Sequence, residues 1–178
     1  MKWGDEIEVT VENVASEGKS VARVDGLVVF VAGGVPGDRV RARVTKSKKK
    51  FVEAEAVEIL SPSPLRVRPR CKYFGTCGGC KWQHVQYAAQ LDFKRQHVID
   101  ALQRIGRLPP GIPVHEVIAA PTELRYRNKI ELSFGRDPAA RPVLGYHRAG
   151  RPSAFVDVED CAIADPRLRP LLAAARAF

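Results

Sequence analysis

The positions of the four cysteines restrict the fold more than any other feature of the sequence. Cys71, Cys77 and Cys80 have the spacing C-x5-C-x2-C, and Cys161 follows much later in the chain. Four thiolates can hold either a four-iron cluster or a structural zinc ion, and both would require the chain to bring Cys161 back to the other three. Unliganded buried thiols are a third interpretation, although a polar, glycine-rich loop is a poor place to bury them.

The three-plus-one grouping of the cysteines favours an iron–sulfur cluster over zinc. Zinc sites usually combine two short pairs of ligands, whereas here three ligands are grouped and the fourth is distant. Gly75, Gly78 and Gly79 permit tight backbone turns between the ligands and leave amide N–H groups that can point at sulfur. The histidines have no metal-ligand spacing and are expected to be structural or surface residues: His84, His97, His115 and His147.

No segment of the sequence predicts export or membrane insertion. The first residues lack the apolar core of a signal peptide. The most apolar run, residues 27–35, is interrupted by glycine and is too short to span a bilayer. We therefore expect a cytoplasmic protein with no membrane partner, in which thiols stay reduced and disulfides are rare. The net charge of +9 favours an anionic partner, and nucleic acid is the usual one.

Residues 1–60 are predicted to form a small β-barrel. In residues 6–12 apolar and polar side chains alternate, which is typical of a half-buried strand, and Asp25-Gly26 is a strong signal for a two-residue hairpin turn. Helical periodicity is absent from this part of the chain. Five strands joined by tight turns suggest a closed or partly open barrel of the OB type. Their expected ranges are 6–12, 20–24, 27–31, 39–45 and 51–60.

Residues 61–178 are predicted to form a second, smaller α+β domain around the cysteines. A proline-containing linker at residues 61–66 separates it from the barrel, because proline cannot continue a central strand. A helix is expected at residues 87–105, with Leu91, Val98, Leu102 and Ile105 on one face and Gly106 at its end. Antiparallel strands should follow within residues 126–158, and a terminal helix at 166–177 should be capped by Asp165.

Three sequence runs make the chain resemble a known family. Cys77-Gly78-Gly79-Cys80-Lys81-Trp82-Gln83-His84 follows Cys71, Tyr126-Arg127-Asn128-Lys129 lies farther along, and Phe155-Val156-Asp157-Val158-Glu159-Asp160 precedes Cys161. Together they are similar to the RNA uracil-C5 methyltransferase family, and residues 1–60 resemble the TRAM barrel that precedes the cysteines in many members. The resemblance implies a [4Fe–4S] cluster held by all four cysteines. It also implies transfer of a methyl group from S-adenosylmethionine to C5 of uridine.

Structured RNA, above all ribosomal RNA, is the expected partner. The lysine-rich turn near residues 46–50 has no nearby acid in the sequence, so its charges are available for phosphate contacts. The arginines at 39, 41 and 43 are instead expected to be neutralised by Glu53 and Glu55 on the neighbouring strand. A second basic stretch, at residues 66–72, leads into the cysteine loop. The family resemblance adds the run at 126–129 to the expected RNA contacts. The candidate RNA-binding residues are Lys46, Lys48, Lys49, Lys50, Arg66, Arg68, Arg127 and Lys129.

The catalytic part of such an enzyme is not expected in this chain. Methyl transfer to C5 of uridine needs a cysteine nucleophile and a base, and a cluster that takes all four cysteines leaves none. No glycine-rich strand-to-helix turn suggests a site for S-adenosylmethionine. We therefore expect the catalytic domain to be missing, the chain alone to be inactive, and the uncovered helix 87–105 to favour weak self-association. A stand-alone zinc-stabilised RNA-binding protein and an iron–sulfur electron carrier remain as alternatives.

Overall fold

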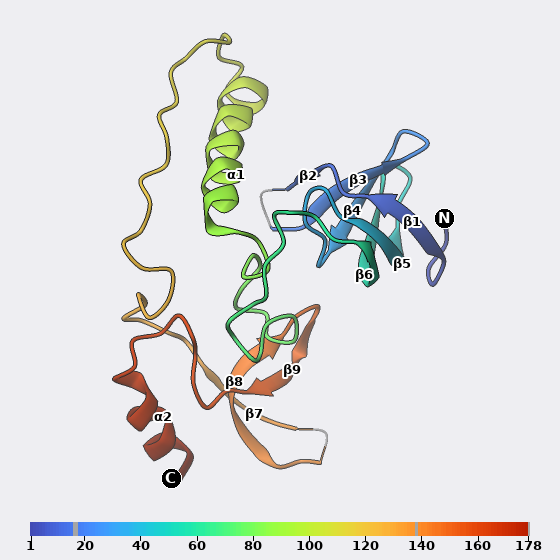
Figure 1. The fold of residues 1–178 in the computed structure, drawn as a ribbon. Coiled ribbons are helices and arrows are strands. Elements are labelled where there is room, and N and C mark those ends of the chain that lie inside the picture. The colour runs from blue at the N-terminus through green and yellow to red at the C-terminus, as the bar shows by residue number, and fades with distance from the viewer. Residues whose placement is uncertain (16–17, 138, 178) are drawn as a thin grey trace. The chain divides into compact units, whose positions relative to one another are not determined.

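The structure, a computed structural model, describes residues 1–15, 18–137 and 139–177 (Figure 1). The chain forms two compact units, and it passes between them more than once. The first unit comprises Met1–Val67 and His84–Ile118, and the second comprises Arg68–Gln83 and Ala119–Phe178. The cysteine loop and the helix that follows it in the sequence thus belong to different units.

The first unit is built on a six-stranded mixed sheet in the order β1-β5-β6-β4-β3-β2. β4 and β6 are parallel to each other, and the other neighbours are antiparallel. Alternate side chains of each strand point to the same side of the sheet. The side chains that form the core on that side are mainly valines. The strands are β1 (Glu6–Thr10), β2 (Asn13–Val14), β3 (Ser20–Val24), β4 (Leu27–Ala32), β5 (Arg39–Ser47) and β6 (Phe51–Ser61).

The hairpin between β3 and β4 confirms the turn predicted at Asp25-Gly26. Both residues have positive φ, 49° and 80°, which a two-residue turn requires if it is to match the twist of the flanking strands. Glycine reaches this conformation without a Cβ clash, and aspartate is among the residues that tolerate it best.

The prediction of five strands was wrong: the strand expected at residues 6–12 ends at Thr10, and a sixth, short strand follows at Asn13–Val14. After β1 the chain leaves β5, and the Val11 amide donates to the Asp38 carbonyl at 2.8 Å. The Glu12 amide then donates to the Val21 carbonyl of β3, also at 2.8 Å. Residues 6–12 therefore form backbone hydrogen bonds near both edges of the sheet, beside β5 at one edge and beside β3 at the other. Among the described residues the strand order is open, and a closed barrel is not confirmed.

The helix predicted at residues 87–105 is confirmed in its extent but not in its uniformity. α1 (Tyr87–Asp100) is α-helical and continues as η1 (Ala101–Ile105), a single π-helical turn. Of the apolar stripe, Leu91 and Leu102 are partly buried, whereas Val98 is 48% and Ile105 83% exposed. Part of the stripe therefore has no cover among the described residues.

The second unit contains a three-stranded antiparallel sheet, β7-β8-β9, and one helix. The sheet was predicted, but its first strand begins at Ser133 and not at residue 126. β7 spans Ser133–Arg136, β8 spans Pro142–Arg148 and β9 spans Arg151–Asp157. The helix α2 (Leu168–Ala177) follows a turn in which Asp165 Oδ1 accepts the Arg167 amide at 2.9 Å. The helix therefore begins two residues later than predicted, and Asp165 caps the turn before α2 instead of the helix itself.

None of the helices in the described part of the chain is both long and apolar enough to cross a lipid bilayer.

Candidate metal centre and nucleic-acid-binding residues

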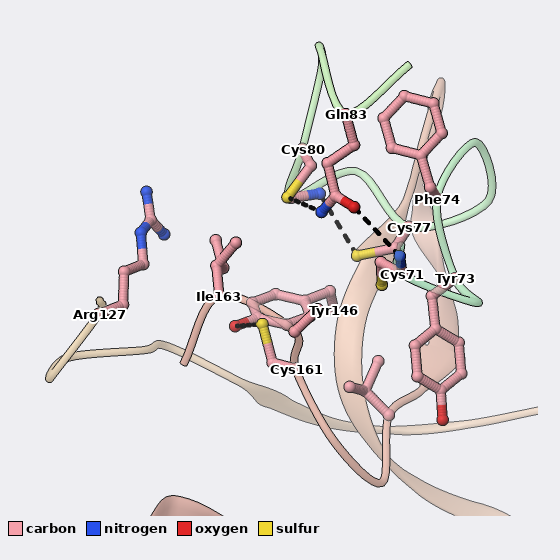
Figure 2. A pocket seen from close by; sticks show the side chains of 13 residues that line it. Cys71, Tyr73, Phe74, Cys77, Cys80, Gln83, Arg127, Tyr146, Cys161 and Ile163 are labelled. Carbon is pink, nitrogen blue, oxygen red and sulfur yellow. Dashed lines mark hydrogen bonds between the residues drawn. The ribbon is translucent and has the colours of Figure 1, made fainter. Parts of the chain in front are cut away.

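All four cysteines line one cavity in the second unit, as the sequence predicts (Figure 2). Cys71, Cys77 and Cys80 come from the loop before α1, and Cys161 comes from the segment after β9. All four are free thiols, and Cys161 is buried. The other walls are mainly apolar and aromatic: Tyr73, Phe74, Tyr146, Val158, Ala162 and Ile163. The fold therefore closes the three-plus-one grouping into one sulfur-lined site.

The cysteine loop is fastened to the end of β8 by backbone hydrogen bonds. The Gly78 amide donates to the His147 carbonyl at 3.0 Å, and the Ala149 amide donates to the Thr76 carbonyl at 2.9 Å. A Cβ at position 78 would lie only 3.0 Å from the His147 oxygen, so glycine is needed for this close approach. Only Gly75 of the three loop glycines has positive φ, at 84°.

Three of the sulfurs accept hydrogen bonds from groups of the same unit. The Gly79 amide lies 3.4 Å from Cys77 Sγ, Gln83 Nε2 lies 3.3 Å from Cys80 Sγ, and the Tyr146 hydroxyl lies 3.8 Å from Cys161 Sγ (Figure 2). Gln83 Oε1 also accepts the Cys71 amide at 3.2 Å. The predicted amide-to-sulfur contact is thus present at Gly79. Gln83 and Tyr146 were not predicted, although Gln83 lies within the cysteine motif.

The surroundings of Cys77 and Cys80 change the acidity of these two thiols. Burial raises the pKa of the Cys77 and Cys80 thiols, and the other cysteines raise it further. Burial also raises the pKa of the Tyr146 hydroxyl, and its hydrogen bond to Cys161 adds to this. Four thiolates would therefore repel one another in this cavity unless a cationic centre compensated them.

The donor set is all sulfur, which is the ligand type that suits either zinc or an iron–sulfur cluster. The described residues that line the cavity include no histidine and no carboxylate. Within the described ranges, no three Cys, His, Asp or Glu side chains are spaced to ligate a single metal ion. The residues present therefore fit a sulfur-ligated group in their chemistry.

The lysine turn between β5 and β6 was predicted to have no nearby acid, and the structure corrects this. Glu53 lies close to the turn, and its carboxylate contacts Lys46 Nζ at 3.3 Å and Lys19 Nζ at 2.6 Å. These lysines lower the pKa of Glu53, with Lys19 contributing most. Lys48, Lys49 and Lys50 are exposed and form no ion pair with a described acid. The available charge of the turn therefore lies at positions 48–50.

The arginines of β5 are neutralised, as predicted, but by different acids. Arg39 and Arg41 both contact Glu8 of β1, at 2.7 and 3.3 Å, and Arg43 contacts Glu6 at 2.8 Å. Arg41 also pairs with Glu58 of β6. Antiparallel pairing with β1 places these acids opposite the arginines, so the expected partners Glu53 and Glu55 are not used.

Arg66 and Arg68, both candidate RNA-binding residues, have different environments. Arg66 pairs with the fully buried Asp38 and donates to the Gly33 carbonyl at 2.8 Å. Its guanidinium is therefore occupied within the first unit. Arg68 is exposed.

The run at 126–129 lies on the surface of the second unit and is not part of a strand. Its one bridge joins Arg127 to Ala164 in parallel orientation. Tyr126, Arg127 and Lys129 are all exposed, and Lys129 contacts Glu131 at 2.7 Å in a fully solvated pair. Arg127 also borders the cysteine cavity and lies to one side of the sulfurs (Figure 2).

The chain is similar to several known proteins over most of its length. Residues 2–57 match the TRAM domain. An uncharacterized RNA methyltransferase of Thermosynechococcus vestitus is 43% identical over 96% of this chain and 37% of its own length. The 23S rRNA (uracil(1939)-C(5))-methyltransferase RlmD of Acidithiobacillus ferrooxidans is 40% identical over 90% of this chain and 36% of its own. The crystal structure of Pyrococcus abyssi tRNA (uracil-54, C5)-methyltransferase superposes with a TM-score of 0.60 at 25% identity, over 96% of this chain and 36% of that one.

The chain thus carries a TRAM domain within a longer region shared with RNA methyltransferases. The relatives that are named by their target support a relationship to the RNA uracil-C5 methyltransferase family. The chain spans little more than a third of the length of the relatives that it matches.

Proposed function

We propose that this chain is the RNA-binding, cluster-carrying part of an S-adenosylmethionine-dependent RNA uracil-C5 methyltransferase. The observation that carries the proposal is the convergence of all four cysteines on one cavity. The chain that forms this cavity is matched along nearly its whole length by RNA methyltransferases. The proposed role is to bind structured RNA and to position a uridine for methylation.

The proposed resident group is a [4Fe–4S] cluster held by Cys71, Cys77, Cys80 and Cys161. Bound there, the cluster would supply a cationic centre that keeps four thiolates together in a buried site. The Gly79 amide and the Gln83 side chain would donate hydrogen bonds to ligand sulfurs. We assign the cysteines to binding and not to catalysis.

Methyl transfer itself is proposed to depend on residues outside these 178. The reaction needs a cysteine that attacks C6 of uridine and a base that removes the C5 proton. A cluster that takes all four cysteines leaves no such nucleophile in this chain. We therefore expect RNA binding without methyl transfer when this chain is assayed alone with S-adenosylmethionine.

Ribosomal RNA is the proposed target. The relative named for 23S rRNA is 40% identical to this chain, whereas the one named for tRNA is 25% identical. Binding to a 23S rRNA fragment should therefore be tighter than binding to tRNA of similar length and charge. Equal affinity for the 23S rRNA fragment and for tRNA would contradict the proposed target and would support RNA binding in general only.

The lysine turn tests the RNA-binding role. Replacing Lys48, Lys49 and Lys50 by alanine should weaken binding and lower the slope of log K against log salt by roughly 2, because each lost phosphate contact removes about 0.7–0.9 from it. Replacement by arginine keeps the charge and should keep the slope. Lys46→Ala is the matched control, since Lys46 is already paired with Glu53. An unchanged slope in the triple alanine variant would exclude this turn from the interface.

Metal analysis tests the cluster. Anaerobically purified protein should contain iron and acid-labile sulfide in equal amounts, about four of each per chain. One zinc ion per chain without sulfide would instead support a zinc-stabilised RNA-binding protein. Reversible redox cycling, together with the absence of salt-dependent RNA binding, would favour an electron carrier.

A further inference from the structure

One arginine contacts the segment that delivers the distant cysteine to the cavity. Arg125 Nη1 donates to Asp160 Oδ1 at 2.6 Å, and Arg125 Nη2 donates to Asp160 Oδ2 at 2.8 Å. This forked arrangement is the strongest form of arginine–carboxylate pair. Nη1 also donates to the carbonyl oxygen of Cys161 at 3.0 Å. The same guanidinium thus contacts Cys161 and the residue before it.

Backbone hydrogen bonds also join residues 125–127 to the residues that follow Cys161. The Arg125 amide donates to the Ala162 carbonyl at 3.1 Å, and the Arg127 amide donates to the Ile163 carbonyl at 2.8 Å. The Asp165 amide returns a hydrogen bond to the Arg127 carbonyl at 2.8 Å. The run 125–127 therefore forms a short parallel ladder along the residues that follow Cys161.

Arg125 adopts a backbone conformation that is unfavourable for its residue type. Its φ is 60°, in the left-handed region that few residues other than glycine occupy. Such a conformation persists where the surrounding contacts determine it strongly. Here those contacts are the fork to Asp160 and the hydrogen bonds to residues 161 and 162.

An exposed ion pair usually contributes little to stability, and Arg125 and Asp160 are only partly covered, at 40% and 31% exposure. The second unit contains a comparable pair, Arg141–Asp137, at 2.7 Å. That pair closes its own local turn and borders no part of the cysteine cavity. The location of the Arg125–Asp160 pair, not its charge alone, distinguishes it.

We propose that Arg125 is a positioning residue that holds Cys161 where the fourth ligand of the metal centre is required. Cys71, Cys77 and Cys80 share one loop, whereas Cys161 reaches the cavity from the far end of β9. The loop itself keeps Cys71, Cys77 and Cys80 close together. For Cys161, the Arg125–Asp160 pair and the hydrogen bonds of residues 125–127 supply the corresponding constraint. The inference rests on the proposed metal centre, but it makes a separate claim about Cys161.

The test is the reactivity of individual cysteines in the full chain, purified anaerobically with its metal. Iodoacetamide labelling followed by peptide mass spectrometry gives the rate at Cys161 relative to the rate at Cys77. In Arg125→Ala this ratio should rise about fivefold or more, as expected for the loss of a charged hydrogen bond. Arg125→Lys, which keeps the charge but not the fork, should give an intermediate ratio. Arg141→Ala should leave the ratio unchanged.

Arg125→Gly separates positioning from general stability. Glycine removes the side chain but accepts positive φ without strain, so this variant should fold at least as well as Arg125→Ala and still expose Cys161. An unchanged ratio in both variants would overturn the inference. A uniform rise at all four cysteines in the Ala, Gly and Lys variants would also overturn it, because it would show a structural role only.

Failure of the metal proposal would be seen separately. Iron and sulfide analysis of the unmodified chain decides whether the cluster is present, whatever happens at position 125. The labelling ratio reports whether Arg125 restrains Cys161, whichever metal the cavity holds.

Discussion

Asp38 is the most completely buried charged residue among those described, and it joins the sheet of the first unit to the linker that leaves it. Its side chain is fully inaccessible and accepts hydrogen bonds from the amides of Val35 and Ser63, each at 2.7 Å. Arg66 completes the set from the linker. Burial alone would raise the pKa of Asp38, but Arg66 and the two amides together lower it.

This network predicts an acid-sensitive contribution to stability. Because folding lowers the pKa of Asp38, the contribution is complete above the ordinary carboxyl value of 3.8 and is lost as the pH falls below it. Asp38→Asn should destabilise the first unit by about 3 kcal/mol at pH 7, since Arg66 would lose its buried partner. Hydrogen exchange of the β4 and β6 amides, measured between pH 7 and 3, checks both expectations.

Glu8→Gln is the matched control for Asp38. Like Asp38, Glu8 forms ion pairs with arginine, here with Arg39 and Arg41, which lower its pKa. Unlike Asp38, Glu8 is exposed. Solvent screens such a pair, so this variant should resemble the unmodified protein at pH 7. Equal protection of the β4 and β6 amides in Asp38→Asn and in the unmodified protein would show that the buried network contributes nothing.

At the scale of elements, local pattern predicted the type of each segment better than its pairing. The apolar stripe of residues 87–105 predicted a helix of the right length. Antiparallel strands were expected from residue 126 onward, but β7 begins only at Ser133. The preceding residues 125–127 bond to the chain after Cys161 instead, and periodicity carries no information about such a partner.

At the scale of the whole molecule, the two units differ in how much they depend on the cysteines. The core of the first unit is a continuous set of strand residues that includes no cysteine. The core of the second unit is smaller, contains Cys161 and packs against Cys80. A metal centre at these cysteines would therefore be part of the second core and would contribute directly to its folding.

Removal of the metal should loosen one unit and spare the other. After anaerobic chelation, amide exchange should accelerate in residues 68–83 and 119–177, while β3–β6 stay protected. Cys161→Ser should reproduce this pattern. Equal acceleration in both units would contradict it and would mean that they fold as one.

The sequence by itself determined those properties that depend on neighbouring residues. The hairpin at Asp25-Gly26, the extent of the helix from Tyr87 and the antiparallel sheet of the second unit follow from turn chemistry and periodicity. The grouping of the cysteines also indicated one sulfur site, because thiolates that share a metal must converge.

Only the tertiary structure decided which distant residues meet. It placed Glu6 and Glu8 opposite the arginines of β5 and Glu53 beside Lys46, ended the first predicted strand at Thr10, and added β2 at the other edge of the sheet. It also brought Arg125 to Cys161. Each of these contacts depends on strand register or on a loop path, and both are set by packing across the whole unit rather than by local residue preference.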